Sequence, residues 1–319
     1  MESDGHPVAG VDYPQTYQQL QRWFPDDAAC LEYLARLRWS AGFVCPACAG
    51  GESWRTRQGL WMCRACGRKT SVTAGTIFHR TRTPLSTWFA AIWFVTSQKN
   101  GVSALGLQRV LGFGSYETAW AWMHKLRRAM VRPDRDLLTG TVEVDETFVG
   151  GRASGLAGAS SDKVPVMVAV ERVSSRKLGR VRLALAAAPN TLELVEFAQA
   201  TIAPGSTVRT DGARMMRRLA DMGYTHEYVN GYAAEDPTTV LPGVHLIASL
   251  LKRWLIGTLH YGVDDAQLRY YLDEYTFRFN RRTARSRGLL FYRLLQQAVK
   301  TDPQPLATLV RPVYQADCT

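Results

Sequence analysis

The sequence predicts a multidomain α/β protein, and three observations lead to this fold class. The chain has 319 residues, more than one hydrophobic core usually holds, so two or three domains are expected. Two Cys-x-x-Cys pairs stand close together near the N-terminus. From Gly140 onward, strand-like and helix-like patterns alternate along the chain, which is typical of a sheet flanked by helices.

The N-terminal part of the chain predicts short helices on either side of a cysteine-bearing segment. Apolar residues recur at helical spacing over residues 17–39, and an apolar helix is expected over 85–96, directly after Pro84. Residues 42–78 hold short strand candidates with glycines at turn positions. Residues 99–130 predict a helix capped by Ser103, a turn over the letters GFGS, and a second helix.

The C-terminal part predicts five strands and several helices. The strand candidates are TVEVDETFV, KVPVMVAVE, GRVRLALA, TVRTD and THEYVN. Helices are expected over 192–202, 213–222, 244–255 and 265–282, and the letters LLFYRLLQQAVK predict a last one. The expected organisation is an N-terminal helical segment (1–41), a metal-binding ribbon (42–80), a helix-turn-helix domain (81–135), an α/β domain (136–290), and a C-terminal helix and tail (291–319).

The charge balance favours a polyanionic partner. The net charge is +11, the isoelectric point is about 9.5, and nucleic acid is the commonest partner of so basic a chain. The alternative is a soluble protein that is simply basic. The apolar run over 88–95 is far shorter than the roughly 20 residues that span a bilayer, and the N-terminus lacks an apolar signal core. We therefore expect a cytoplasmic protein with reduced thiols and no membrane partner.

The paired cysteines predict a structural zinc site. The ligands would be Cys45, Cys48, Cys63 and Cys66, with 14 residues between the two pairs. Two such pairs joined by a short hairpin bring four thiolates to one tetrahedral ion, and this arrangement is a zinc ribbon. Several arginines and a lysine surround the pairs, which favours contact with phosphates; a solvated basic face is the alternative.

The second helix of the helix-turn-helix segment carries three basic residues. Lys125, Arg127 and Arg128 are expected to reach DNA phosphates, with the N-terminus of that helix facing a groove. The neighbouring Trp120 and Trp122 are expected in the core. The alternative is a plain helical hairpin without a DNA-binding role.

Two aspartates lie in or at the end of predicted strands. Asp145 belongs to an alternating strand, and Asp211 ends the strand TVRTD just before Gly212. Carboxylates at strand ends project into a cleft beside a sheet, and their hard oxygen atoms suit Mg²⁺ or Mn²⁺. Two such cations can support cleavage of a phosphodiester. Taken alone, the two aspartates are also compatible with ordinary surface residues.

Several separated segments resemble the ISXO-type transposases of bacterial insertion sequences. The letters VEVDETFVGGR, the TDG that contains Asp211, SLLKRWLIGT and YLDEYTFRFNRR carry the resemblance, together with the ribbon and GVSALGLQRVLGFGSYETAWAWMHKLRRAM. The resemblance covers about residues 17–295. It implies a DDE-class enzyme whose catalytic domain has an RNase H-like fold, a mixed sheet flanked by helices.

The resemblance also implies a set of site residues. Asp145, Asp211 and His245 would be the catalytic metal ligands, where the family most often has glutamate in the third place and some branches have asparagine or histidine. Lys252, seven residues after His245 and two helical turns further on, would contact DNA phosphate together with Arg253. Two alternatives stay open for the histidine. It is structural and Glu235, Asp236 or Glu146 is the third ligand, or it marks an inactive copy.

Further basic residues follow in the letters FRFNRRTARSR, where Arg281 and Arg282 are expected to grip DNA or, alternatively, to form a solvated face. The implied activity is DNA transposition by a homo-oligomer in the nucleoid of a bacterium. The enzyme would bind terminal inverted repeats, hydrolyse the ends with Mg²⁺ or Mn²⁺, and join the freed 3′-hydroxyl to target DNA. The alternatives are a transcription regulator, a domesticated inactive transposase, or a nuclease of the same fold.

Overall fold

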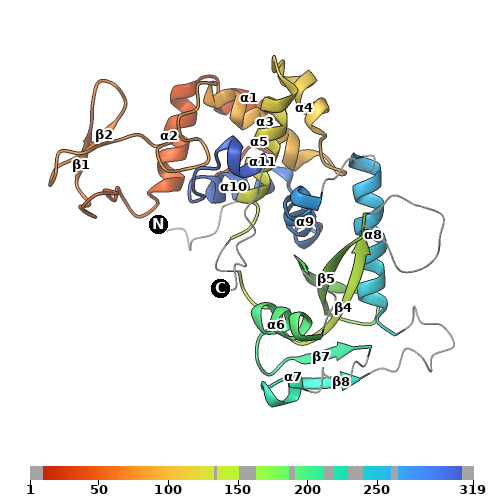
Figure 1. Cartoon of the computed structure of the whole chain (residues 1–319). Coiled ribbons are helices and arrows are strands. Elements are labelled where there is room, and N and C mark those ends of the chain that lie inside the picture. The colour runs from red at the N-terminus through yellow and green to blue at the C-terminus, as the bar shows by residue number, and fades with distance from the viewer. Residues whose placement is uncertain are drawn as a thin grey trace. The chain divides into compact units, whose positions relative to one another are not determined.

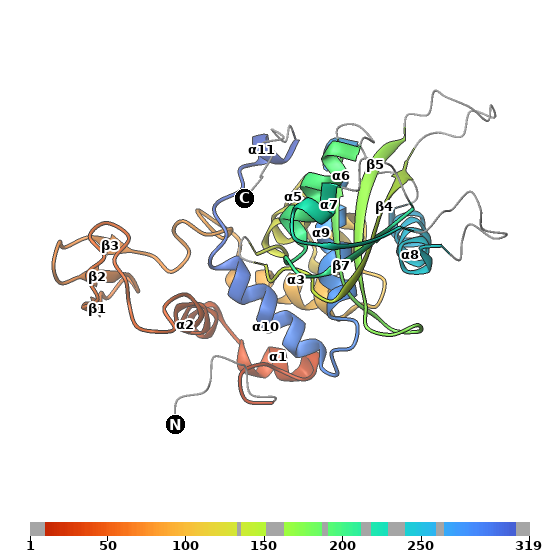
Figure 2. The same ribbon diagram turned by 90° about the horizontal axis from the view of Figure 1, so that it is seen from below.

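The computed structural model describes residues 10–132, 135–150, 163–186, 191–211, 218–228, 240–259 and 265–310. The chain divides into two compact units, and Figures 1 and 2 show the elements of both. The first unit comprises Met1–Arg132 and Ala284–Val310, and the second comprises Pro133–Thr283 and Arg311–Thr319. No described helix is both long enough and apolar enough to cross a bilayer.

The first unit combines a small sheet with a group of helices. Its helices are α1 (Tyr17–Trp23), α2 (Asp27–Arg38), α3 (Leu85–Ser97), α4 (Ala104–Leu111), α5 (Tyr116–Ala129), α10 (Arg287–Ala298) and α11 (Leu306–Val310). Helix α10 packs against α2, α3 and α5 although it lies far from them in sequence. An aromatic cluster of Phe24, Phe89 and Phe291 fills this contact, with ring centroids 4.7–6.1 Å apart. Burial of these large rings supplies much of the unit's hydrophobic stabilisation.

The small sheet carries the cysteine pairs. Its antiparallel strands β1 (Ser53–Arg55), β2 (Trp61–Cys63) and β3 (Lys69–Thr70) pair in sequence order. The hairpin between β1 and β2 begins with Thr56, whose backbone N–H donates to the Leu60 carbonyl at 2.8 Å, and contains Gly59 with φ of 77°. This is the hairpin that the cysteine spacing predicts, and it confirms the ribbon.

Helices α4 and α5, joined by a turn, are the two helices expected over residues 99–130, and their DNA-binding role stays a prediction. The side chain of Ser103 caps α4 by accepting from the Gly106 N–H at 3.0 Å, as the sequence predicts. Gly112 ends α4 in the left-handed region with φ of 68°. Residues other than glycine adopt this backbone conformation only at a cost in free energy. Ser115 then caps α5 through the Glu117 N–H.

The second unit is built on one mixed sheet. Its strands are β4 (Thr141–Val149), β5 (Val164–Arg172), β6 (Leu178–Leu185), β7 (Thr207–Thr210) and β8 (Thr225–Tyr228), in the order β6-β5-β4-β7-β8. The β6-β5-β4 part is antiparallel, whereas β7 runs parallel to β4 and β8 runs parallel to β7. The helices are α6 (Thr191–Thr201), α7 (Arg218–Asp221), α8 (Pro242–Leu259) and α9 (Asp265–Asn280).

Helices cover both faces of this sheet. On one face, Val142 and Val144 of β4 belong to a buried cluster with residues of α6. On the other face, Val149 of β4 and alternate residues of β5 pack against α8 and α9. Figure 1 shows α8 alongside β4 and β5. Since side chains alternate along a strand, Glu143, Asp145 and Thr147 point to the α8 face.

The predicted elements agree with the described ones in kind and order. All five strand candidates are strands, and the mixed sheet with flanking helices is consistent with the RNase H-like class. The predicted helix over 213–222 and the end of the strand candidate THEYVN fall partly outside the described residues. Contacts place α10 with the first unit, whereas the expected α/β domain extended to residue 290. The expected domain boundaries stay predictions.

Candidate metal centres and nucleic-acid interface

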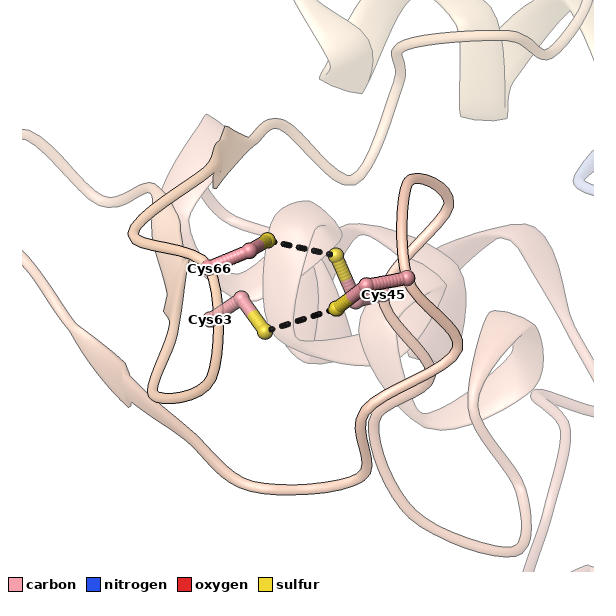
Figure 3. A group of neighbouring side chains, drawn as sticks. Cys45, Cys63 and Cys66 are labelled. Atoms are coloured by element: carbon pink, nitrogen blue, oxygen red, sulfur yellow. Dashed lines mark hydrogen bonds between the residues drawn. The ribbon is translucent and has the colours of Figure 1, made fainter.

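The four paired cysteines converge on one point. Their sulfur atoms all lie within 4.8 Å of one another. The Sγ atoms of Cys45 and Cys66 are 3.7 Å apart, and those of Cys48 and Cys63 are 3.6 Å apart, as Figure 3 shows in part. A tetrahedral zinc with bonds of about 2.3 Å places its sulfur ligands roughly 3.8 Å apart. The spacing therefore fits a structural zinc ion.

Backbone geometry prepares the same cysteines for a cation. Each pair is followed by a residue in the left-handed region, Ala49 with φ of 58° and Gly67 with φ of 71°, which turns the chain back around the sulfurs. Against a hydrogen bond from the Gly50 N–H, the Cys66 and Cys63 side chains raise the pKa of Cys48. A hydrogen bond from the Ala47 N–H is the largest of the causes that lower the pKa of Cys45 to about 6. The thiolate is the form that binds a metal, so this N–H favours zinc binding.

The helix-turn-helix presents less positive charge than its sequence suggests. Arg127 is only 2% exposed, and Lys125 and Arg128 are half-buried. The expectation that Arg127 contacts DNA does not agree with this burial, since its guanidinium has almost no surface to offer a phosphate. The first turn of α5 is accessible instead, with Tyr116 52% exposed. The N-terminus of α5 is thus the part of this helix that is open to a groove.

Two aspartates meet where β4 and β7 run side by side. The parallel register pairs Thr141 with Thr207 and Glu143 with Arg209, so its continuation brings Asp145 level with Asp211. Burial, and then the charges of Glu146 and Asp211, raise the pKa of Asp145 to about 7. Two close carboxylates repel each other when both are charged, and a cation bound between them would remove this repulsion.

His245 lies in the first turn of α8 and faces a groove. The groove has a volume of about 720 Å³ and is lined by Thr147, His245, Ala248, Ser249, Lys252, Arg253, Ile256 and Gly257. His245, Ser249, Lys252 and Arg253 are all exposed and recur at helical spacing, so they form one stripe of α8. Thr147 follows Asp145 by two residues on the same face of β4. The groove thus reaches the face of β4 to which Asp145 belongs, although neither aspartate is among its lining residues.

Within the described part of the chain, the cysteine quartet is the only group of three or more metal-ligating side chains whose ligand atoms lie within 4.8 Å of one another. His245 therefore does not close with Asp145 and Asp211 into a cluster of that size. The structure brings the two aspartates together and places the histidine at the start of the helix that covers the same face of the sheet.

Sequence reasoning missed one lysine whose charge acts on Lys252. Lys163 precedes β5, and its charge, after burial, lowers the pKa of Lys252. Two lysines that repel each other across a surface favour an anion between them. A lone lysine before a strand carries no pattern from which this proximity could be predicted.

The two arginines at the end of α9 have different surroundings. Arg282 donates from Nη1 to the carbonyls of Gly179 and Phe279 at 3.1 and 2.9 Å, and from Nη2 to the Leu178 carbonyl, which ties α9 to β6. Arg281 is half-buried, stacks over the Phe277 ring at 4.1 Å, and donates to the Phe277 carbonyl at 3.3 Å. Both side chains thus stabilise the fold, and the predicted DNA contacts stay predictions.

Comparison with protein families gives two matches. Residues 137–280 match the model of the ISXO2-like transposase domain, and residues 25–69 match the transposase zinc-ribbon domain. No curated protein matches the chain. The first match covers the whole five-stranded sheet together with α8 and α9. The second contains all four zinc-ligand cysteines.

Proposed function

Because the chain is an ISXO2-like DDE transposase with a transposase zinc ribbon, we propose the steps by which it acts on DNA. It binds the terminal inverted repeats of an insertion sequence and hydrolyses a phosphodiester at each end. It then joins the freed 3′-hydroxyl to target DNA. The observation that carries this proposal is the effect of the Asp211 charge on the pKa of Asp145, together with the parallel register of β4 and β7, on a sheet against which α8, the helix with His245, packs.

The proposed catalytic ligands are Asp145, Asp211 and His245. The carboxylate oxygens of the two aspartates suit Mg²⁺ or Mn²⁺. In a two-cation centre, ligands of different ions lie up to about 8 Å apart, because two bonds of about 2 Å add to a separation of about 4 Å between the ions. A histidine outside a 4.8 Å cluster is therefore compatible with a ligand of one ion while the aspartates bridge or flank the pair.

The chemistry consists of two in-line displacements at phosphorus. In the first, a water oxygen attacks the phosphorus at the transposon end, the bond to the 3′-oxygen breaks, and that oxygen takes a proton. In the second, the 3′-hydroxyl attacks a target phosphorus and a target 3′-oxygen leaves. When bound, divalent cations would lower the pKa of the attacking group and stabilise the leaving oxygen. Neither step needs a covalent enzyme intermediate.

The histidine changes the expected metal preference. Imidazole is a softer and uncharged ligand, so it suits Mg²⁺ less well than a carboxylate does. We expect a weaker second cation site and relatively better activity with Mn²⁺. Equal or better cleavage with Mg²⁺ across the pH range would count against this expectation.

Several surfaces are proposed to hold DNA. Exposed basic residues of the ribbon, such as Arg57, Arg68 and Lys69, would contact phosphates together with the first turn of α5. Lys252 and Arg253 would contact DNA along the groove that begins at His245. A homo-oligomer would hold the two transposon ends together.

The test is a short duplex that carries one end of the element, incubated with the protein and Mn²⁺. Asp145→Asn should abolish nicking and joining while end binding, measured by gel shift, stays within about twofold of the wild type. Asp221→Asn changes an exposed aspartate on α7 of the same unit and should retain activity. Joining by Asp145→Asn would refute the assignment. Wild-type binding without nicking would favour a regulator or a domesticated, inactive transposase.

A further inference from the structure

Glu143 is a buried carboxylate that the two displacement steps do not use. Its side chain has no exposed surface, and it sits on β4 two residues before Asp145, on the face that α8 covers. An isolated carboxylate at such a depth is strongly unfavourable unless donors or cations satisfy it. The identity of its partners therefore indicates why an acid occupies this position.

The partners of Glu143 come from two different elements of the same face. Its Oε2 accepts from the backbone N–H groups of Gly243 and Val244, at 2.6 and 3.2 Å, in the first turn of α8. Its Oε1 lies 3.2 Å from Nε of Arg172 on β5 and 3.9 Å from Nη1 of Arg209 on β7. The carboxylate satisfies free N–H groups at the positive end of α8, which is a favourable place for negative charge.

These contacts share one relation to the proposed metal ligands. Glu143 precedes Asp145 by two residues, its ion-pair partner Arg209 precedes Asp211 by two, and Gly243 precedes His245 by two. Positions two apart on a strand lie on the same face, and those in the first turn of a helix move with its start. The three elements that carry the proposed ligands are thus joined at one side chain.

We propose that Glu143 is the positioning residue of this centre, which fixes the start of α8, and hence His245, relative to Asp145 and Asp211. The proposal rests on the proposed function for its catalytic meaning. Glu143 touches no reacting atom; it acts by holding the histidine where an ion between the strands can reach it. Groups that orient metal ligands in this way typically change metal affinity or activity about 10- to 100-fold when mutated.

Gly243 allows the contact between Glu143 and the start of α8 because it has no side chain. A Cβ at this position would lie 2.7 Å from Oε2 of Glu143, 3.1 Å from Cδ2 of Leu178 and 3.2 Å from Cγ1 of Val170. Only glycine lets the start of α8 approach the carboxylate this closely. Gly243→Ala should therefore displace the same contact that Glu143 makes, so the two changes should be non-additive when combined.

The experiment compares Glu143→Gln with a matched control in the same sheet. Glu171→Gln removes another buried carboxylate, which is 8% exposed, pairs with Arg180 at 2.5 Å and accepts from the Thr139 N–H at 3.0 Å. Glu171 lies on β5 but pairs in register with Val142, whose side chain faces α6. The control variant therefore loses a buried charge, as Glu143→Gln does, but keeps the contacts at the start of α8.

Two measurements on the full-length protein decide the matter. The first is hydrogen exchange of a peptide over residues 240–251, which should exchange about tenfold faster in Glu143→Gln and unchanged in Glu171→Gln. The second is the Mn²⁺ concentration for half-maximal nicking of the end duplex, which should rise about 10-fold or more only in Glu143→Gln. Gly243→Ala should resemble Glu143→Gln in both.

The outcomes separate the two proposals. Equal exchange and equal Mn²⁺ dependence in the two glutamine variants would overturn the role of Glu143, even if the wild type nicks DNA normally. A wild type that does not nick would overturn the proposed function, and the exchange measurement would still decide whether Glu143 fixes the start of α8. A uniform loss in both variants, in proportion to their unfolding temperatures, would show a purely structural effect.

Discussion

The raised pKa of Asp145 makes a prediction about stability without divalent cations. Burial is the largest cause, followed by the charges of Glu146 and Asp211, and together they move the pKa from 3.8 to about 7. Between these values the folded chain keeps a proton that the unfolded chain has lost. The free energy of unfolding should therefore fall as pH rises through this window, in contrast to an ion-paired aspartate.

The size of the effect follows from the shift. A change from 3.8 to about 7 corresponds to at most about 4 kcal/mol, fully developed above the folded-state pKa. Linkage gives a loss of about 2 kcal/mol at about pH 5 and about 4 kcal/mol at about pH 8. Asp145→Asn imitates the protonated acid and removes the repulsion. The variant should gain about 2–3 kcal/mol relative to the wild type between these two pH values.

The assay is denaturant unfolding of wild type and Asp145→Asn near pH 5 and pH 8, with zinc retained and no added divalent cation. In such a protein of two units, fluorescence and far-UV circular dichroism should be followed together, because the units can unfold separately. A stability difference that is the same at both pH values would mean that the folded state does not raise the pKa of Asp145. Added Mn²⁺ should narrow the difference at the higher pH, because a bound cation relieves the repulsion.

Three further predictions concern the zinc site, the DNA groove and the helix-turn-helix. Cys63→Ser should lose the bound zinc, seen with a chromogenic chelator, and lose end binding while the mixed sheet stays folded; zinc retained at full occupancy would contradict the ribbon. Lys252→Ala should weaken binding to any DNA sequence and lower the slope of log affinity against log salt concentration by about one. Lys300→Ala, which changes an exposed lysine of the first unit, should leave this slope unchanged, and equal slopes in the two variants would exclude a contact of Lys252 with phosphate. Gly112→Ala should cost about 1–2 kcal/mol of unfolding free energy because φ is 68°, but Gly114→Ala should be nearly neutral, and equal costs would contradict the strain.

The sequence was informative where local pattern determines structure. Alternation in TVEVDETFV indicates a strand, and the same pattern places Asp145 on one face of it. The proximity of Asp211 follows because β4 and β7 run parallel, and continuing their register by two residues brings Asp145 level with Asp211. The cysteine spacing predicts the ribbon, since two knuckles and a hairpin leave little freedom for the four sulfurs.

The features that sequence could not indicate depend on distant contacts. Arg127 reads as a surface cation, yet α5 packs against α10 and α11 from the far end of the chain and the arginine is buried. Glu143 reads as an ordinary acid in an alternating strand. Its role depends on a helix that begins about a hundred residues later, and no local pattern encodes that contact.

The most direct test of the proposed centre is anomalous scattering from Mn²⁺ in crystals of the protein bound to its own end DNA. We expect two peaks about 4 Å apart, with carboxylate oxygens of Asp145 and Asp211 and the imidazole of His245 each about 2.0–2.3 Å from a peak. Ions held by the two aspartates with Glu146 as third ligand, and the imidazole of His245 left in solvent, would contradict it.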